Sequence, residues 1–202
     1  MTRSQNDDDL LSFGRYVAIE DDLEKVRQGA FEAIRLLKSE TPLELFTVPG
    51  LDDRPADAIR WMESHDPNLL VTLTLDRTNR IAYVDAQAAD PEAAAAILEA
   101  FDATATYGTL DEHLALLDSD NGERQLVRVA LAAGGHDYDQ RVADVFQQAF
   151  ASPLVENRRA ATYAVRVLGW PVLAEALAEA EPVEPDEELR HLMRAVLHHS
   201  AS

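Results

Sequence analysis

Residues 139–170 constrain the fold most strongly, because their apolar side chains recur at the spacing of two α-helices. The first helix shows the intervals i, i+3, i+4, i+7 and i+8 at Val142, Val145, Phe146, Ala149 and Phe150. The second repeats this spacing at Ala161, Ala164, Val165 and Leu168. Ser152 and Pro153 break the chain between the two, and Gly169 is placed to end the second helix. We therefore expect an antiparallel pair whose apolar stripes must be buried against further helices.

Similar helix pairs lie on both sides of this one, so three consecutive pairs are predicted over residues 109–199. The second helix of the central pair resembles the last helix of the chain. Aligning the two matches Arg159 with Arg190 and Val165 with Val196. This degenerate internal repeat is typical of an array of stacked helix pairs.

The run Arg158-Arg159-Ala160-Ala161 places basic residues before small ones on the second helix of the central pair. In this respect the chain resembles the HEAT-repeat and lyase-type HEAT-like family, and the resemblance is clearest over residues 109–199. It implies an α-solenoid in which the second helices of successive pairs line the concave side. It also implies that the ends of the array need a covering element.

The N-terminal half is predicted to be helical as well, with one exception. Helices are expected at about 10–19, 21–38, 55–65 and 90–101, and a β-hairpin at about 69–86, where Val71, Leu73 and Leu75 alternate with threonines. The run at 43–48 fits either a strand or a packed connector. The predicted fold class is therefore mainly α, a HEAT-like α-solenoid of antiparallel helix pairs with one β-hairpin in the N-terminal half. Its two regions, 1–106 and 107–202, form one continuous structural unit in this interpretation. The hairpin is either an insertion within an earlier helix pair or part of a small α/β cap, and both alternatives stay open.

The charge of the chain disfavours nucleic acid and anionic membranes as partners. The sequence holds 37 acidic and 18 basic residues, which gives a net charge of −19, and a negative surface repels phosphate groups. Residues 61–120 alone hold 12 acidic and 2 basic residues, a net charge of −10. Two interpretations stay open for this segment, a solvated acidic face or a docking surface for a basic partner.

Several features are absent from the sequence, and their absence narrows the expected cellular location and the reactions that the chain could catalyse. It contains no cysteine, which fits a reducing compartment and leads us to expect a cytoplasmic protein. We see no apolar signal segment and no run long enough to cross a membrane. The six histidines are scattered and form no HExxH motif, and no phosphate-binding loop is present. We therefore predict no metal, no cofactor and no enzymatic activity.

The first functional hypothesis is a non-catalytic protein-protein interaction module. Its acidic face would bind a basic partner protein, as an immunity protein or inhibitor contacts a nucleic-acid-directed toxin. The predicted contact residues lie in or beside the hairpin and are Asp76, Asp85, Asp90 and Glu92.

Two alternatives stay open. In one, the chain is a scaffold subunit that holds an acidic segment of its partner through concave arginines of the second helices. These are Arg124, Arg128, Arg158, Arg159, Arg190 and Arg194. They also fit internal salt bridges to neighbouring helices. In the other, the chain is an enzyme that uses His113 or His136 with carboxylates in the solenoid groove. His113 shares a predicted face with leucines, which favours a packed histidine.

Overall fold

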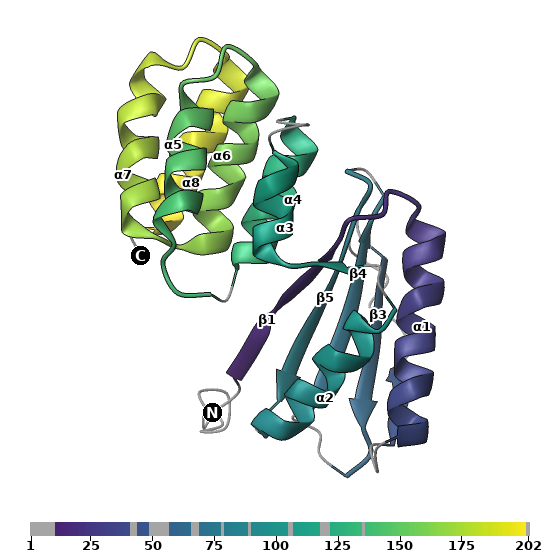
Figure 1. Cartoon of the computed structure of the whole chain (residues 1–202). Helices are drawn as coiled ribbons and strands as arrows, with labels where there is room; N and C mark the ends of the chain where they lie inside the picture. Colours follow the sequence, from purple (N-terminus) through teal and green to yellow (C-terminus); the bar gives the residue numbers. More distant parts are fainter. Residues whose placement is uncertain are drawn as a thin grey trace. The chain divides into compact units, whose positions relative to one another are not determined.

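A computed structural model gives the fold of the chain as two compact units, Met1–Gly108 (unit 1) and Thr109–Ser202 (unit 2). Figure 1 labels the elements of both, and each unit is described by itself. The structure describes residues 11–40, 44–48, 57–65, 69–77, 79–88, 90–104, 107–117, 122–134 and 136–200.

Unit 1 is built on a six-stranded sheet with the strand order β2-β3-β4-β5-β1-β6, in which every neighbouring pair is antiparallel. Its elements follow in chain order as β1 (Leu11–Ala18), α1 (Leu23–Glu40), β2 (Leu45–Val48), β3 (Asp57–Glu63), β4 (Leu70–Asp76), β5 (Ile81–Ala88), α2 (Pro91–Asp102) and β6 (Tyr107–Gly108). The predicted hairpin is present, since β4 and β5 pair from Leu70–Gln87 to Asp76–Ile81. It forms the centre of a larger sheet.

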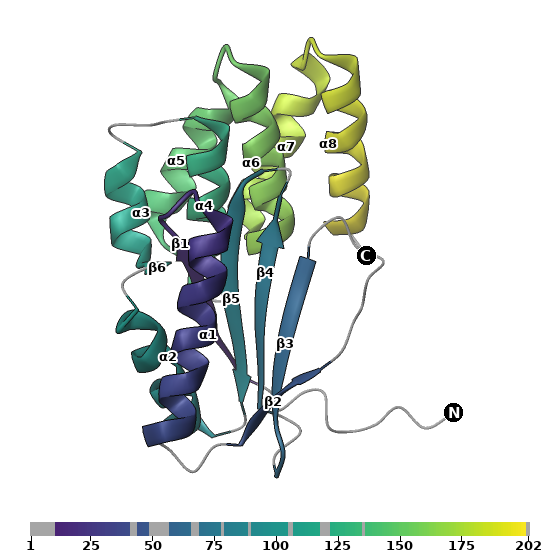
Figure 2. The same ribbon diagram turned by 90° about the vertical axis from the view of Figure 1, so that its right-hand side faces the viewer.

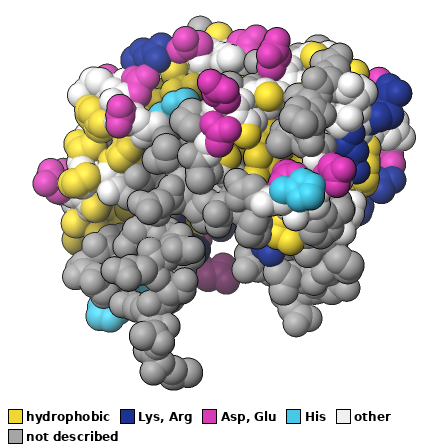
Figure 3. Space-filling view, turned by 90° about the horizontal axis from the view of Figure 1, so that it is seen from below, with side chains coloured by type: hydrophobic (Ala, Val, Ile, Leu, Met, Phe, Trp, Pro, Cys, Tyr) yellow, Lys and Arg dark blue, Asp and Glu magenta, His cyan; other side chains and the backbone are white. Residues whose placement is uncertain are grey.

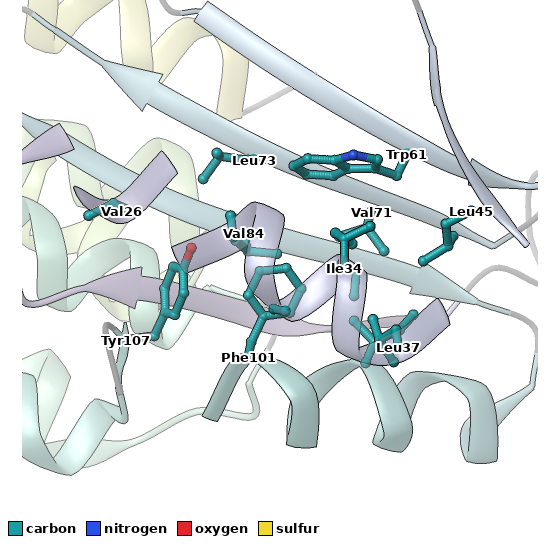
Figure 4. Close-up of a cluster of buried hydrophobic side chains, with 14 of the residues drawn as sticks. Val26, Ile34, Leu37, Leu45, Trp61, Val71, Leu73, Val84, Phe101 and Tyr107 are labelled. Atoms are coloured by element: carbon teal, nitrogen blue, oxygen red, sulfur yellow. The ribbon is translucent and has the colours of Figure 1, made fainter. Parts of the chain in front are cut away.

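The core of unit 1 lies between the sheet and its two helices. Figures 1 and 2 show α1 and α2 on the same face of the strands. Along β4 every second residue is buried, because side chains alternate between the two faces of a strand. Figure 4 shows how side chains from the helices and strands meet in this core, with the rings of Phe101 and Tyr107 next to each other.

The predicted fold class is wrong, because unit 1 is an α/β structure and not the helical start of a solenoid. Residues 11–18 and 57–63 were expected to be helical, and both are strands, β1 and β3. In β3, Ala58, Ile59 and Met62 fit a helical period, while Ile59 and Trp61 also fit the period of a strand. Hydrogen bonding to β2 on one side and β4 on the other selects the second pattern.

The structure also gives the local conformation of two further segments, around Gly14 and at residues 43–48. The register of β1 against β5 shifts between Ser12 and Arg15, so Gly14 lies at a β-bulge. The run at 43–48, left open between strand and connector, contains the strand β2. Pro55, the expected first residue of a helix, lies outside the described residues.

The elements of unit 2 within the described residues are all helices. They are α3 (Leu110–Leu116), α4 (Glu123–Ala133), α5 (Gln140–Phe150), α6 (Val155–Leu168), α7 (Pro171–Ala180), the short 3₁₀ helix η1 (Glu181–Val183) and α8 (Glu187–Ser200). The second helices of the three pairs are neighbours, since α6 packs against both α4 and α8, while α5 packs against α7. Stacked hairpins of this kind bury the apolar stripes that a single pair leaves open. No helix in the described part of the chain is both long enough and apolar enough to cross a membrane.

Several helix ends in this half follow the signals in the sequence. Thr109 and Glu112 form a reciprocal capping box at the start of α3. Gly169 ends α6 in the left-handed conformation, with φ of 63°. Trp170 then caps α7, whose first residue is Pro171. Local chemistry therefore sets where these helices begin and end.

Candidate functional site

A groove of about 850 Å³ lies at one end of the helices of unit 2. Its walls come from the end of α5, the turn between α5 and α6, one side of α7, and the connector between α7 and α8. The lining residues are Gln147, Phe150, Ala151, Ser152, Pro153, Arg158, Val172, Glu175, Ala176, Glu179, Ala180, Val183, Glu184 and Pro185. We call it the α7 groove.

A buried ion pair joins the two turns that form the end of the α7 groove. Arg158 donates from Nε and Nη2 to the two carboxylate oxygens of Glu184, at 2.7 and 2.8 Å. Its Nη1 donates to the carbonyl oxygen of Ser152 at 2.9 Å. The Glu184 side chain is 1% exposed and that of Arg158 is 11% exposed. The pair therefore fixes the connector 181–186 against the turn after α5.

The environment of this pair favours its charged form. The Arg158 guanidinium holds the pKa of Glu184 below its ordinary value, and the backbone N–H of Asp186, 2.9 Å from the carboxylate, acts in the same direction. In return the carboxylate raises the pKa of Arg158. Both groups are satisfied by hydrogen bonds, as buried charges need to be.

Two more of the predicted concave arginines bind the same connector. Arg194 donates from Nε to a carboxylate oxygen of Glu181 at 2.6 Å, and Arg190 donates from Nη1 to the carbonyl oxygen of Glu184 at 3.3 Å. Together with Arg158, they bring three of the six arginines to residues of unit 2 itself. Glu184 was not singled out in the sequence, although its position between Val183 and Pro185 in a proline-rich connector marks it as an acidic residue in an apolar setting.

The remaining concave arginines lie elsewhere. Arg124 and Arg159 are half-buried on α4 and α6, and Arg128 is buried on α4. None of these three lines the α7 groove. The six predicted concave arginines therefore do not form one surface. Three of them bind residues of the turns and the connector of unit 2, and the other three lie at separate positions.

The rim of the α7 groove is acidic. Among its described lining residues Arg158 is the only cation, and Glu184 neutralises it. Glu175 and Glu179 are exposed on α7, and neither forms an ion pair with a described residue. Four residues apart, they stand one helical turn from each other, about 6 Å between their Cβ atoms. These two carboxylates give the groove its net negative charge.

Exposed apolar side chains stand on both turns that the ion pair joins. Val183 is 79% exposed and Leu154 is 54% exposed, and they are the two most exposed large hydrophobic residues of the described chain. Pro153 and Pro185 next to them are exposed too. Exposed apolar groups that gather beside a groove with a polar rim mark interaction surfaces.

A second groove, of about 860 Å³, lies along the first half of α7, between the end of α6 and helix α8, and shares Glu175 with the α7 groove. Its floor includes Val165, Ala174 and Val196, and Leu192 is exposed at 37% beside them. Its ionisable side chains are those of Arg166, Glu175 and His199. It lacks the pair of exposed glutamates and the buried Arg158–Glu184 ion pair of the α7 groove.

The acidic residues predicted as a docking face occupy separate places in unit 1. Asp76 closes the hairpin turn by accepting hydrogen bonds from the backbone N–H and Nδ2 of Asn79, at 3.0 and 2.6 Å. Asp90 caps α2 at the opposite end of β5, where it accepts from the backbone N–H of Glu92. Asp85 lies between them in β5, and Glu92 is exposed on the first turn of α2. The length of β5, about 25 Å, separates the first of these residues from the last two.

The two histidines considered for an active site lie outside both grooves. His113 is fully buried on α3, where its backbone carbonyl accepts a hydrogen bond from Gln125 Nε2 at 2.7 Å. The same Gln125 nitrogen is 3.5 Å from Nδ1 of the ring. His136 is exposed between α4 and α5. Within the part of the chain that the structure describes, no three His, Asp or Glu side chains are grouped as a metal site would need.

These features were compared with family models, curated proteins and solved structures. No match was found in any of the three comparisons. The geometry of the α7 groove is therefore the basis on which a function is proposed.

Proposed function

We propose that this chain is a non-catalytic protein-protein interaction module that binds its partner in the α7 groove. The observation that carries the proposal is the exposure of Val183 and Leu154 on two turns that a buried ion pair holds in place. A rigid surface loses little conformational entropy on binding, and exposed apolar anchors supply contact area. The HEAT-like resemblance of residues 109–199 stays part of this proposal.

The other hypotheses receive less support from the same geometry. A scaffold that holds an acidic segment needs available arginines, but Arg158 and Arg194 bind Glu184 and Glu181. An enzyme with His113 at its centre needs access to that ring, which is fully buried. An immunity or inhibitor protein is one kind of interaction module, and a cytoplasmic location, favoured by the lack of cysteine, agrees with it.

Affinity capture from the native cell tests the proposal with three forms of the chain. We expect wild type to retain a partner protein that Val183→Glu loses, because a carboxylate within an apolar contact must be desolvated. Leu192→Glu is the matched control, since Leu192 is an exposed leucine of the second groove. Titration with the purified partner should then show a loss of about 2 kcal/mol for Val183→Glu, or about thirtyfold in Kd.

Two results would contradict the proposal. One is a partner that binds Val183→Glu and Leu154→Glu as tightly as wild type. The other is a partner that only Leu192→Glu loses, which would move the binding site to the second groove.

A further inference from the structure

We infer that the occupant of the α7 groove is a cationic amphipathic helix of the partner protein, with two basic side chains one turn apart. The inference rests on the proposed function and adds the chemistry and the shape of the bound segment. Its first support is charge. The groove presents Glu175 and Glu179 without an ion pair to described residues, while its single cation is neutralised within the wall.

The spacing of the carboxylates fits a helix. A helix that lies along α7 offers side chains at i and i+4 about 6 Å apart, which matches the separation of Glu175 and Glu179. The groove follows α7 from Val172 to Ala180, a length of about 12 Å, or roughly two turns. Two turns are enough for two cationic side chains and one apolar side chain between them.

The floor and one wall of the groove suit the apolar side of such a helix. Phe150, Ala176 and Ala180 line the floor, and Val183 stands at the edge. Small alanine side chains on α7 leave room for a larger side chain of the partner. Figure 3 shows another face of the molecule, seen from below, on which carboxylates lie among hydrophobic side chains.

An extended segment fits this groove less well than a helix. With i, i+2 spacing, an extended chain could also reach both carboxylates. Its backbone N–H and C=O groups would, however, face the side of α7, whose own backbone groups are already hydrogen-bonded within the helix. A helix satisfies its own backbone and needs only side-chain contacts.

A labelled synthetic peptide tests the inference directly by fluorescence anisotropy. The peptide is an amphipathic helix of about 15 residues, long enough to form a helix, with lysines at i and i+4 beside a leucine stripe. We expect it to bind wild type at low NaCl and more weakly at high NaCl, because exposed ion pairs are screened. A peptide with the same composition but lysines at i and i+2 should bind less tightly.

Charge reversal in the groove gives the decisive comparison. Glu175→Lys/Glu179→Lys should weaken binding about tenfold, since two attractions become repulsions. The matched control is Asp137→Lys/Glu188→Lys, because both residues are exposed, lie in unit 2 and make no ion pair with a described residue. It changes the net charge equally and should alter Kd by about twofold at most. Circular dichroism confirms that each variant remains folded.

Several outcomes would overturn the inference. Equal binding to both double variants would show attraction to the overall charge alone. Tighter binding of an acidic peptide, or a wild-type dimer that Val183→Glu dissociates, would replace the cationic helix with another occupant. If Val183→Glu loses the native partner while the lysine peptide fails to bind, the proposed function stands and the cationic helix is refuted.

Discussion

Two buried polar side chains, Tyr107 in unit 1 and Glu184 in unit 2, differ in their hydrogen bonding. In unit 1 the hydroxyl of Tyr107 is buried beside Phe101 and, within the described residues, has no hydrogen-bond partner. In unit 2 the carboxylate of Glu184 is buried more deeply, yet both of its oxygens accept hydrogen bonds. A group with a partner can hold two segments together, whereas one without a partner only lowers stability. The Arg158–Glu184 ion pair therefore holds two turns of unit 2 together at the α7 groove.

The two units also differ in how far apart their contacts lie in the sequence. The sheet of unit 1 pairs β1 with β5 across most of the unit, while the helices that pack together in unit 2 are neighbours or next neighbours but one along the chain. Each unit contains one of the two tryptophans, Trp61 in unit 1 and Trp170 in unit 2. Variants that keep a single tryptophan therefore report the unfolding of each unit separately.

The largest effect is expected from breaking the ion pair between Arg158 and Glu184 at the α7 groove. Arg158→Met leaves Glu184 buried without its cation, and such a change costs about 3–5 kcal/mol of unfolding free energy. Urea unfolding followed by Trp170 fluorescence measures the loss, and the Trp61 signal should change less.

Two further variants accompany this measurement. The exposed Arg166→Met is the control and should have little effect. The double variant Arg158→Met/Glu184→Met should recover much of the stability, because no buried charge remains. A single variant as stable as wild type would remove the contrast between the two units.

Acid should weaken unit 2 through the same carboxylate. The pKa of Glu184 lies below its ordinary value of 4.5, so the unfolded state binds more protons than the folded state in acid. The stabilisation is complete above about pH 4.5 and is lost as the pH falls through the lowered pKa. Thermal unfolding by Trp170 fluorescence should therefore depend less on pH in Glu184→Gln than in wild type. The exposed Glu188→Gln should keep the wild-type dependence.

A smaller loss is expected at the end of α6. Gly169 adopts φ of 63°, and a Cβ placed there would meet no atom within 4 Å. The cost of Gly169→Ala is therefore conformational, about 1 kcal/mol, and Gly169→Asn should cost less because asparagine tolerates this region better. Gly122 has an ordinary φ of −73°, so Gly122→Ala should have a smaller effect in the same urea measurement.

The smallest effect is expected in unit 1 and has the opposite sign. Tyr107→Phe removes a buried hydroxyl that lacks a described partner while keeping the ring on Phe101. It should leave stability unchanged or raise it by up to about 1 kcal/mol. Burial also raises the pKa of Tyr107, so alkaline titration of the folded protein should show one tyrosine fewer ionising with the rest. A clear loss of stability in Tyr107→Phe would mean that the hydroxyl has a partner after all.

The sequence by itself determined the helices of unit 2 and their ends. The spacing of Val142, Phe146 and Phe150 predicts α5, and Gly169 predicts the end of α6, because both signals depend on neighbours within a few residues. The hairpin of β4 and β5 was also predicted, since its strands alternate and follow each other closely. A helix or a tight hairpin forms the hydrogen bonds of its backbone within one short segment, so the sequence of that segment is sufficient to predict it.

Only the tertiary structure decided the sheet and the site. Residues 57–63 fit both periods, and they form β3 because β2 and β4, the strands before and after it in the chain, supply hydrogen-bond partners on both sides. The predicted arginines were read along single helices, which could not show that Arg158, Arg190 and Arg194 meet the connector before α8. Whether a charge faces a ligand or its own chain depends on which segments pack together, and residue spacing along the sequence does not contain that information.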